Sequence, residues 1–344
     1  MSIFDHSTNP YFTTTQNAWL RSSLHKNGLR AQQVRALAEH ADTRRYLRIY
    51  CRNTSIICLQ TTGNHDLATF IATSKDLAEK NIPVPHIIDH NTSLGLALIS
   101  DLGDLTLRKA ILKDPTQSFF LYEKAVTLMQ KLQNTQPKKL KPHYTSQRAQ
   151  DNMMLCVQWY CEKLCQSPLT PVERSTWQRV TAQISNLWDE IPVGVCHRDF
   201  HADNLMVTTG KLGNKLHILD YQDLSTGPFL YDLASLVTDH YQPAEKKKKS
   251  HLFKMYYKNL HQKNTNSFRQ NQDWLHLLCY QRNIKNLGVF ARLALTQNKY
   301  HFLDNIPRMF ANMRKIAIPE QAYDELIDML WQKFPQNRKR SIKF

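Results

Sequence analysis

Asp199 and Asn204 lie five residues apart in the segment 195–207, VCHRDFHADNLMV, and Asp220 follows sixteen residues after Asn204. A carboxylate can accept the proton of a hydroxyl group, and an amide oxygen with a second carboxylate can hold Mg²⁺ against nucleotide phosphates. Phosphoryl transfer from ATP requires this set of groups. The spacing therefore predicts Asp199 as the catalytic base, and Asn204 and Asp220 as ligands of Mg²⁺.

The residues next to Asn204 and Asp220 predict how these two side chains meet. Two short strand-like runs, 204–207 and 215–219, enclose the polar segment 208–214. This pattern predicts a hairpin whose open end brings Asn204 and Asp220 together. The spacing H-x-D-x-x-x-x-N also occurs by chance in many chains, so the prediction depends on the Asp after the second run and on the elements that precede the motif.

Those preceding elements form a small α+β lobe in the first hundred residues. The strand-like runs are 45–52, 55–60, 86–89 and 94–99, and a helical period covers 66–80. Asn53-Thr54 separates the first two runs, as in a hairpin. Two strands, a helix and two further strands predict a small antiparallel sheet with one helix.

The pattern changes to long helices after Asp101-Leu102-Gly103-Asp104. The expected helices are 106–112, 117–132, 146–164, 171–190, 247–263, 272–295, 306–316 and 319–334. With 344 residues, the chain exceeds the usual size of one domain, which favours two units that share a cleft. We expect an N-terminal domain at 1–100 that covers a nucleotide, and a mainly helical domain at 101–344 that holds the catalytic loop, the metal and the acceptor.

Composition excludes other ways of binding nucleotides and other classes of protein. The nine glycines fit neither G-x-G-x-x-G nor G-x-x-x-x-G-K-[ST], which excludes a Rossmann fingerprint and a Walker loop. Apolar residues make up 42% of the chain and charged residues 22%, as in a globular protein. The seven cysteines form no C-x-x-C pair, and residues 1–10 show no export signal, so we expect reduced thiols in the cytoplasm.

The net charge of +16 favours anionic partners such as nucleotides or anionic metabolites. Lysine and arginine gather in the runs 246–249 and 338–343. Such runs are typical of a solvated loop or tail, so neither predicts binding of nucleic acid. No apolar run is long enough to span a membrane.

Several segments carry a resemblance to a known family. Residues 197–204, 219–223 and 227–233 resemble the aminoglycoside phosphotransferase/choline kinase family of the protein-kinase-like fold. More narrowly, the chain resembles the anomeric N-acetylmuramate/N-acetylglucosamine kinases of cell-wall recycling in the segments 42–48, 98–103, 158–160 and 281–292. The resemblance implies a two-lobed α+β fold and phosphorylation, with ATP and Mg²⁺, of the C1 hydroxyl of these amino sugars. A uridylyltransferase that makes the UDP-sugar would use the product.

The resemblance also suggests where nucleotide and sugar bind. Backbone N–H groups near Thr43 and the guanidinium of Arg45 could meet phosphate oxygens, although three arginines on an exposed strand would look the same. Ser100 and Leu102 lie in the hinge that would pair with adenine. The candidates for sugar binding are Trp159, Tyr160, Asp223 and Arg282. For Trp159 and Tyr160, packing in the protein interior is an equal alternative. For Arg282, the equal alternative is a structural ion pair.

Two departures from related kinases bear on the substrate. The third strand has IICLQ at 56–60 where a protein kinase has its phosphate-binding lysine, which argues against protein-kinase activity. His201-Ala202-Asp203 stands where the similar sugar kinases have Pro-Arg, which puts a preference for N-acetylmuramate in question. An aminoglycoside or choline remains an alternative acceptor, and a silent binding module is a rival of another class.

Overall fold

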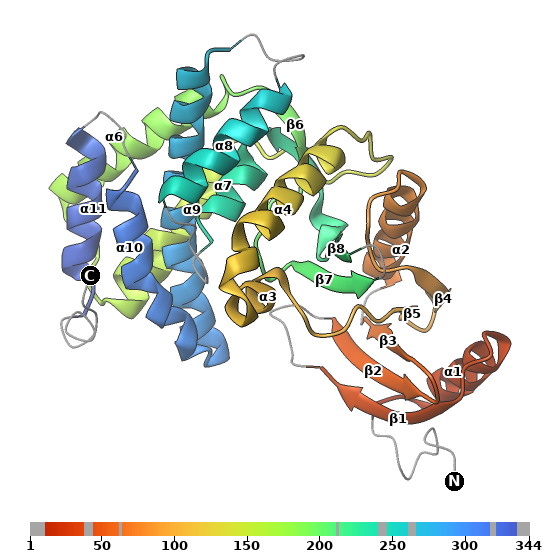
Figure 1. Cartoon of the computed structure of the whole chain (residues 1–344). Helices are drawn as coiled ribbons and strands as arrows, with labels where there is room; N and C mark the ends of the chain where they lie inside the picture. The colour runs from red at the N-terminus through yellow and green to blue at the C-terminus, as the bar shows by residue number, and fades with distance from the viewer. Residues whose placement is uncertain are drawn as a thin grey trace. The chain divides into compact units, whose positions relative to one another are not determined.

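The computed structural model describes residues 11–37, 44–61, 64–210, 213–239, 246–260, 266–316 and 321–335 (Figure 1). By its internal contacts the chain forms two compact units. The first comprises Met1–Leu107, Pro137–Lys139 and Leu205–Gln222, and the second comprises Arg108–Gln136, Leu140–Asn204 and Asp223–Phe344. These units differ from the predicted domains 1–100 and 101–344 chiefly in the placement of the hairpin within Leu205–Gln222, which belongs to the first unit. It groups with the first unit because the N–H of Val207 donates to Leu105 and that of Ile218 to Pro83, at 2.7 and 2.8 Å.

The first unit contains a five-stranded antiparallel sheet. Its strands, in spatial order, are β1 (Ala31–Ala36), β2 (Arg45–Cys51), β3 (Ser55–Gln60), β5 (Leu96–Ser100) and β4 (Ile87–Asn91). Tyr50 pairs with Ser55 across the turn at Asn53-Thr54, so the predicted hairpin is confirmed. The second predicted strand pair is confirmed as β4 and β5.

One face of this sheet is covered by α1 (Thr14–Lys26). Leu20 and Leu24 of the helix share a buried cluster with Leu47, Cys58 and Leu98 of three strands. Burying each of these leucine side chains contributes roughly 1.5–3 kcal/mol. Cys58, at the centre of β3, therefore faces the α1 core.

The remaining elements of the first unit are α2 (Asn64–Glu79) and the hairpin of β7 (Leu205–Gly210) and β8 (Gly213–Ile218). Leu205 pairs with Ile218 at the open end, as the sequence predicted. The two strands are longer than predicted, because pairing continues to Gly210 and Gly213. Gly213 has φ 91°, a left-handed conformation that glycine adopts without strain.

The second unit is mainly helical. Its strands and longer helices are α3 (Leu107–Lys113, which begins at the last residue of the first unit), α4 (Ser118–Gln133), α5 (Ser146–Leu155), η2 (Cys156–Leu164), α6 (Pro171–Trp188), β6 (Val193–Cys196), β9 (Ser225–Pro228), α7 (Tyr231–Val237), α8 (Lys246–Leu260), α9 (Phe268–Gln297), α10 (Ile306–Arg314) and α11 (Gln321–Lys333). The predicted helices are confirmed to within a few residues at most ends. Helix α9 is central, since α5, η2, α7 and α10 all pack against it (Figure 1).

The predicted helix 146–164 is not uniform. It is α-helical to Leu155 and then π-helical through η2, where the N–H of Cys165 donates to the carbonyl of Tyr160. At this junction α9 approaches closely, because a side chain at Gly288 would overlap the Leu155 carbonyl. Only glycine therefore fits at this point of α9.

The seven cysteines form no disulfide, and all except the half-buried Cys165 are buried. Burial raises the pKa of thiols such as Cys58 and Cys279, the latter to about 12. No helix within the described ranges is both long and apolar enough to cross a membrane.

Candidate active site

The loop that carries Asp199 begins at the buried end of β6 and is anchored by two buried carboxylates. Asp232 of α7 accepts hydrogen bonds from the backbone N–H groups of His197 and Arg198, at 2.7 and 2.9 Å. Asp239 accepts one from the N–H of Ala202, at 2.9 Å. Burial raises the pKa of Asp232, and the two N–H donors oppose this by stabilising the charged form.

The backbone just before Asp199 is strained. Arg198 has φ 76°, in the left-handed region that residues other than glycine rarely adopt. Such a conformation costs of order 1–3 kcal/mol and persists when its surroundings enforce it. The paired bonds to Asp232 enforce it here, and the guanidinium of Arg198 lies 5.0 Å from the ring centre of Tyr144. The turn presents the next residue, Asp199, as a half-exposed carboxylate.

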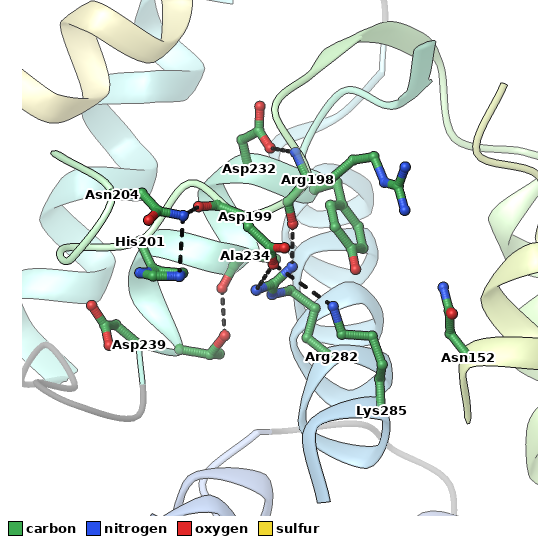
Figure 2. Close-up of polar contacts among 12 residues, drawn as sticks. Asn152, Arg198, Asp199, His201, Asn204, Asp232, Ala234, Asp239, Arg282 and Lys285 are labelled. Carbon is green, nitrogen blue, oxygen red and sulfur yellow. Dashed lines mark hydrogen bonds and ion pairs between the residues drawn. The ribbon is translucent and has the colours of Figure 1, made fainter. Parts of the chain in front are cut away.

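Two cations of α9 lie beside Asp199. Nη2 of Arg282 is 3.5 Å from Oδ1 of Asp199, and Nζ of Lys285 is 3.8 Å from the same oxygen (Figure 2). Partial burial acts to raise the pKa of Asp199, but Lys285 and Arg282 outweigh this effect and hold the pKa well below the usual range. Burial lowers the pKa of Lys285, and Asp199 opposes that shift. Asp199 is therefore ionised at neutral pH and can accept a hydrogen bond from a hydroxyl group.

Asn204 lies next to Asp199, as predicted. Its Nδ2 donates to the backbone carbonyl of Asp199 at 2.9 Å and lies 3.3 Å from Nε2 of His201 (Figure 2). With the amide nitrogen held in this way, the amide oxygen is on the other side of the group. An amide oxygen is a hard ligand that suits Mg²⁺. The amide of Asn204 thus fits the predicted metal.

Asp220 lies in the first unit, two residues after β8. Its φ is 58°, and its half-exposed carboxylate accepts a hydrogen bond from Gln222 at 2.6 Å and lies 3.7 Å from Arg44. The next residue is buried: the hydroxyl of Tyr221 bonds to that of Ser74 at 2.6 Å, and its ring stacks on that of Phe70. Tyr221 therefore ties Asp220 to α2, and a half-exposed carboxylate fits a metal ligand.

The residues predicted to bind nucleotide lie in the first unit, except that Thr43 is outside the described residues. Arg45 is exposed at the start of β2, and Leu102 is half-buried. Ser100 exchanges two hydrogen bonds with His86, one through its hydroxyl and one through its N–H, both 2.9 Å. Their roles remain predictions.

Sequence reasoning missed an ion-pair network at the hinge. Arg48, buried on β2, pairs with Asp101 at 2.7 Å and with Asp104 at 2.9 Å, and it donates to the carbonyl of Gly103. Asp101 also accepts a hydrogen bond from Ser55 at 2.6 Å. The network fastens the segment after β5 to the sheet. The signal was an arginine in the apolar run of β2, followed later by Asp101 and Asp104.

The structure corrects one predicted sugar contact and shows an ion pair at another. The Tyr160 side chain is fully buried, donates to the carbonyl of Leu330 at 2.9 Å and stacks on Phe334, so it packs and cannot meet a sugar. Arg282 is buried in the ion pair with Asp199, which was the structural alternative. Trp159 is half-buried on η2 and Asp223 is exposed, so their roles remain predictions.

The groups that sequence reasoning missed in the second unit are Asp232, Asp239 and Lys285. Lys285 follows Arg282 by three residues, a spacing that puts two side chains on one face of a helix. That spacing, next to the resemblance in 281–292, was a usable signal.

An ionised carboxylate on a constrained loop, with a neighbouring amide oriented for a cation, is the arrangement of an enzyme that transfers phosphoryl groups to hydroxyls. The chain belongs to the phosphotransferase enzyme family, whose model matches residues 33–253. An N-acetylmuramate/N-acetylglucosamine kinase of Neisseria meningitidis serogroup B is 27% identical over 287 residues, which cover 81% of this chain and 84% of that protein. A protein of the same name from Pseudomonas putida is 25% identical over 293 residues, which cover 83% of this chain and 84% of that protein.

Solved structures confirm the predicted protein-kinase-like α+β fold. Choline kinase LicA from Streptococcus pneumoniae is similar with a TM-score of 0.61 at 12% identity, over 88% of this chain and 99% of that one. The predicted family and fold are thus confirmed.

Proposed function

We propose that this phosphotransferase uses ATP and Mg²⁺ to phosphorylate the C1 hydroxyl of free N-acetylmuramate and N-acetylglucosamine. The observation that carries the proposal is the charge around Asp199: its near neighbours on α9 are the cations Arg282 and Lys285, both within 4 Å. A neutral or anionic acceptor suits such surroundings. The names of the relatives from Neisseria meningitidis and Pseudomonas putida support an amino sugar.

Asp199 binds the acceptor hydroxyl and takes its proton in this proposal. Asn204 and Asp220 hold Mg²⁺, which when bound neutralises charge on the nucleotide phosphates. The hairpin register that pairs Leu205 with Ile218 supports this assignment, since Asn204 and Asp220 flank that pair along the chain. Thr43 and Arg45 meet the phosphates, and the hinge residues Ser100 and Leu102 meet the adenine edge.

The anomeric position is the part of the proposal that a simple experiment tests most directly. The C1 hydroxyl is more acidic than the other sugar hydroxyls because the ring oxygen withdraws electron density, so one carboxylate suffices to activate it. Trp159 and Asp223 remain candidates for contact with the sugar. The 1-phosphate product is the substrate that a uridylyltransferase of peptidoglycan recycling would consume.

The test is ADP release with ATP, Mg²⁺ and a panel of acceptors. Free N-acetylmuramate and N-acetylglucosamine should be turned over, whereas the methyl glycoside of N-acetylglucosamine, which lacks a free O1, should not. The product should show phosphorus–proton coupling to H1. A 6-phosphate product, or turnover of the glycoside near that of the free sugar, would reject the anomeric position.

Choline and an aminoglycoside in the same panel test the alternative acceptors. Both carry positive charge, which Arg282 and Lys285 would repel. We expect no ADP release above the rate without acceptor. Preferential turnover of either would replace the amino sugar in the proposal.

A further inference from the structure

Asp199 makes both of its described ion pairs through one oxygen. Arg282 and Lys285 approach Oδ1, at 3.5 and 3.8 Å, and among the described residues no hydrogen bond or ion pair is made to Oδ2. The carboxylate is half exposed, so Oδ2 is the atom that an acceptor can reach. A carboxylate held at one oxygen has only its second oxygen to offer as a base.

Arg282 is a rigid partner in this arrangement. Its Nη1 donates to the carbonyl of Arg198 at 2.7 Å, so it bonds to the backbone just before the carboxylate that it pairs with. Its guanidinium lies 4.9 Å from the ring centre of Tyr231, and Tyr231 packs edge to face against Tyr144. An arginine with this many contacts has little freedom to move.

Lys285 is attached differently. Its side chain is 15% exposed, and the ion pair with Asp199 is the contact that its ammonium group makes among the described residues. Figure 2 shows the side-chain nitrogen of Lys285 directed at Asp199. A lysine has three N–H donors on a flexible stem, and burying that charge is costly unless it is paired. Among the described residues, Asp199 is therefore the partner that compensates the charge of Lys285.

We propose that Arg282 and Lys285 form a clamp on Oδ1 of Asp199, and that Lys285 is the positioning residue which keeps Oδ2 directed at the acceptor hydroxyl. The position of the clamp along α9 is set by Gly288, three residues after Lys285, where the helix backbone meets the Leu155 carbonyl. This inference rests on the role of Asp199 in the proposed function, and it adds a residue to which that function assigned no part.

The first test compares Lys285→Met with Lys285→Arg in the full chain. Loss of the charge frees the carboxylate to rotate, and a misplacement of about 1 Å costs on the order of 100-fold in rate. We expect Lys285→Met to lower kcat roughly 10- to 100-fold with the KM for ATP unchanged, and Lys285→Arg to restore much of the loss. A kcat within twofold of the parent in Lys285→Met, or no rescue by arginine, would overturn the proposal.

Arg292→Met is the matched control. Arg292 is an exposed cation on the same helix, two turns from Lys285, and its removal changes the net charge equally. Its kcat and melting temperature should equal those of the parent. If Lys285→Met has a lower melting temperature than the parent, its kcat is measured well below that temperature, where all of the variant is folded.

A double-mutant cycle separates positioning from direct contact with substrate. In an Asp199→Asn background, Lys285→Met should cause no further loss in single-turnover rate, because its action passes through the carboxylate. A further loss equal to that in the parent would mean that Lys285 acts on the substrate itself and would overturn the positioning role. If the parent protein turns over no amino sugar, the proposed function fails. The clamp can then still be tested, because the same double-mutant cycle can be measured on the intrinsic ATP hydrolysis of the protein, in which water is the acceptor.

Discussion

At the scale of single residues, Asp199 is a carboxylate of low basicity surrounded by fixed positive charge. Such a group contributes by orienting the hydroxyl and receiving its proton late, as the phosphorus–oxygen bond forms. Replacing Asp199 with Asn keeps the shape and removes this capacity. We expect kcat to fall by roughly 10²–10⁴-fold with nucleotide affinity nearly unchanged, as measured by ADP release and calorimetry. A folded Asp199→Asn protein with near-normal turnover would exclude the role.

Asp220 and Asp223 provide a matched pair of carboxylates at the same scale. Asp220→Ala removes a hard oxygen ligand, so nucleotide binding should lose most of its dependence on Mg²⁺. Asp223→Ala removes an exposed carboxylate that we assign to the acceptor, so nucleotide binding should keep that dependence. The measurement is a titration of the nucleotide with and without Mg²⁺. Equal Mg²⁺ dependence in Asp220→Ala and the parent would contradict the metal assignment.

At the scale of elements, the close approach of α9 to the α5–η2 junction has a direct consequence for stability. Alanine is normally better than glycine inside a helix, by about 1 kcal/mol. At Gly288 the added methyl group would overlap the Leu155 carbonyl, so the helices must move apart. We expect Gly288→Ala to lower the free energy of unfolding by about 1–3 kcal/mol in denaturant titrations.

Gly210→Ala is the control for that experiment. Among the described residues, a methyl group there would meet only the Gly213 carbonyl, at 3.9 Å, and Gly210 has no positive φ. Its unfolding free energy should stay within about 0.5 kcal/mol of the parent. A destabilisation as large as that of Gly288→Ala would show that loss of any glycine, and not the helix contact, is responsible.

Most elements were predictable from the sequence because their signals are local. The β2–β3 turn and the period of α4 are visible within a few residues. The π-helical turns of η2 were not predictable, since the residue that meets them, Gly288, is more than a hundred positions away. Helix α1 was missed although its capping box, Thr13 with Gln16, is a local signal. Strands as short as β6 and β9 leave no periodicity to detect.

For the site, types and spacing identified the residues with polar chemistry but not their partners. Asp199 and Asn204 were predicted to act together, and they are hydrogen-bonded. Arg282 was a candidate in the sequence, but its pairing and that of Lys285 with Asp199, and the anchoring of the loop by Asp232, follow from the fold because these residues come from distant segments. Tyr160 was misassigned because a buried aromatic and a sugar-stacking aromatic look alike in sequence.

At the scale of the whole molecule, the excess of 45 Lys and Arg over 29 Asp and Glu creates a positive field around an enzyme proposed to bind a polyanion. Salt screens such fields over about 10 Å at 0.1 M. We expect the KM for ATP to rise roughly 3- to 10-fold when ionic strength increases from about 0.02 to about 0.2 M. The KM for the neutral sugar N-acetylglucosamine should stay constant in the same titration. An equal rise in both would indicate a general effect of salt on the fold.

The distribution of thiols has a practical consequence for following how this chain opens. Six of the seven cysteines are buried, three of them on β2, β3 and β6, two in η2 and one in α9, and Cys165 alone is half exposed. A thiol reacts as its thiolate, which burial suppresses. Brief alkylation of the native protein should therefore label one position. The time at which each further cysteine becomes labelled, located by mass spectrometry, would give the time at which the element that carries it opens.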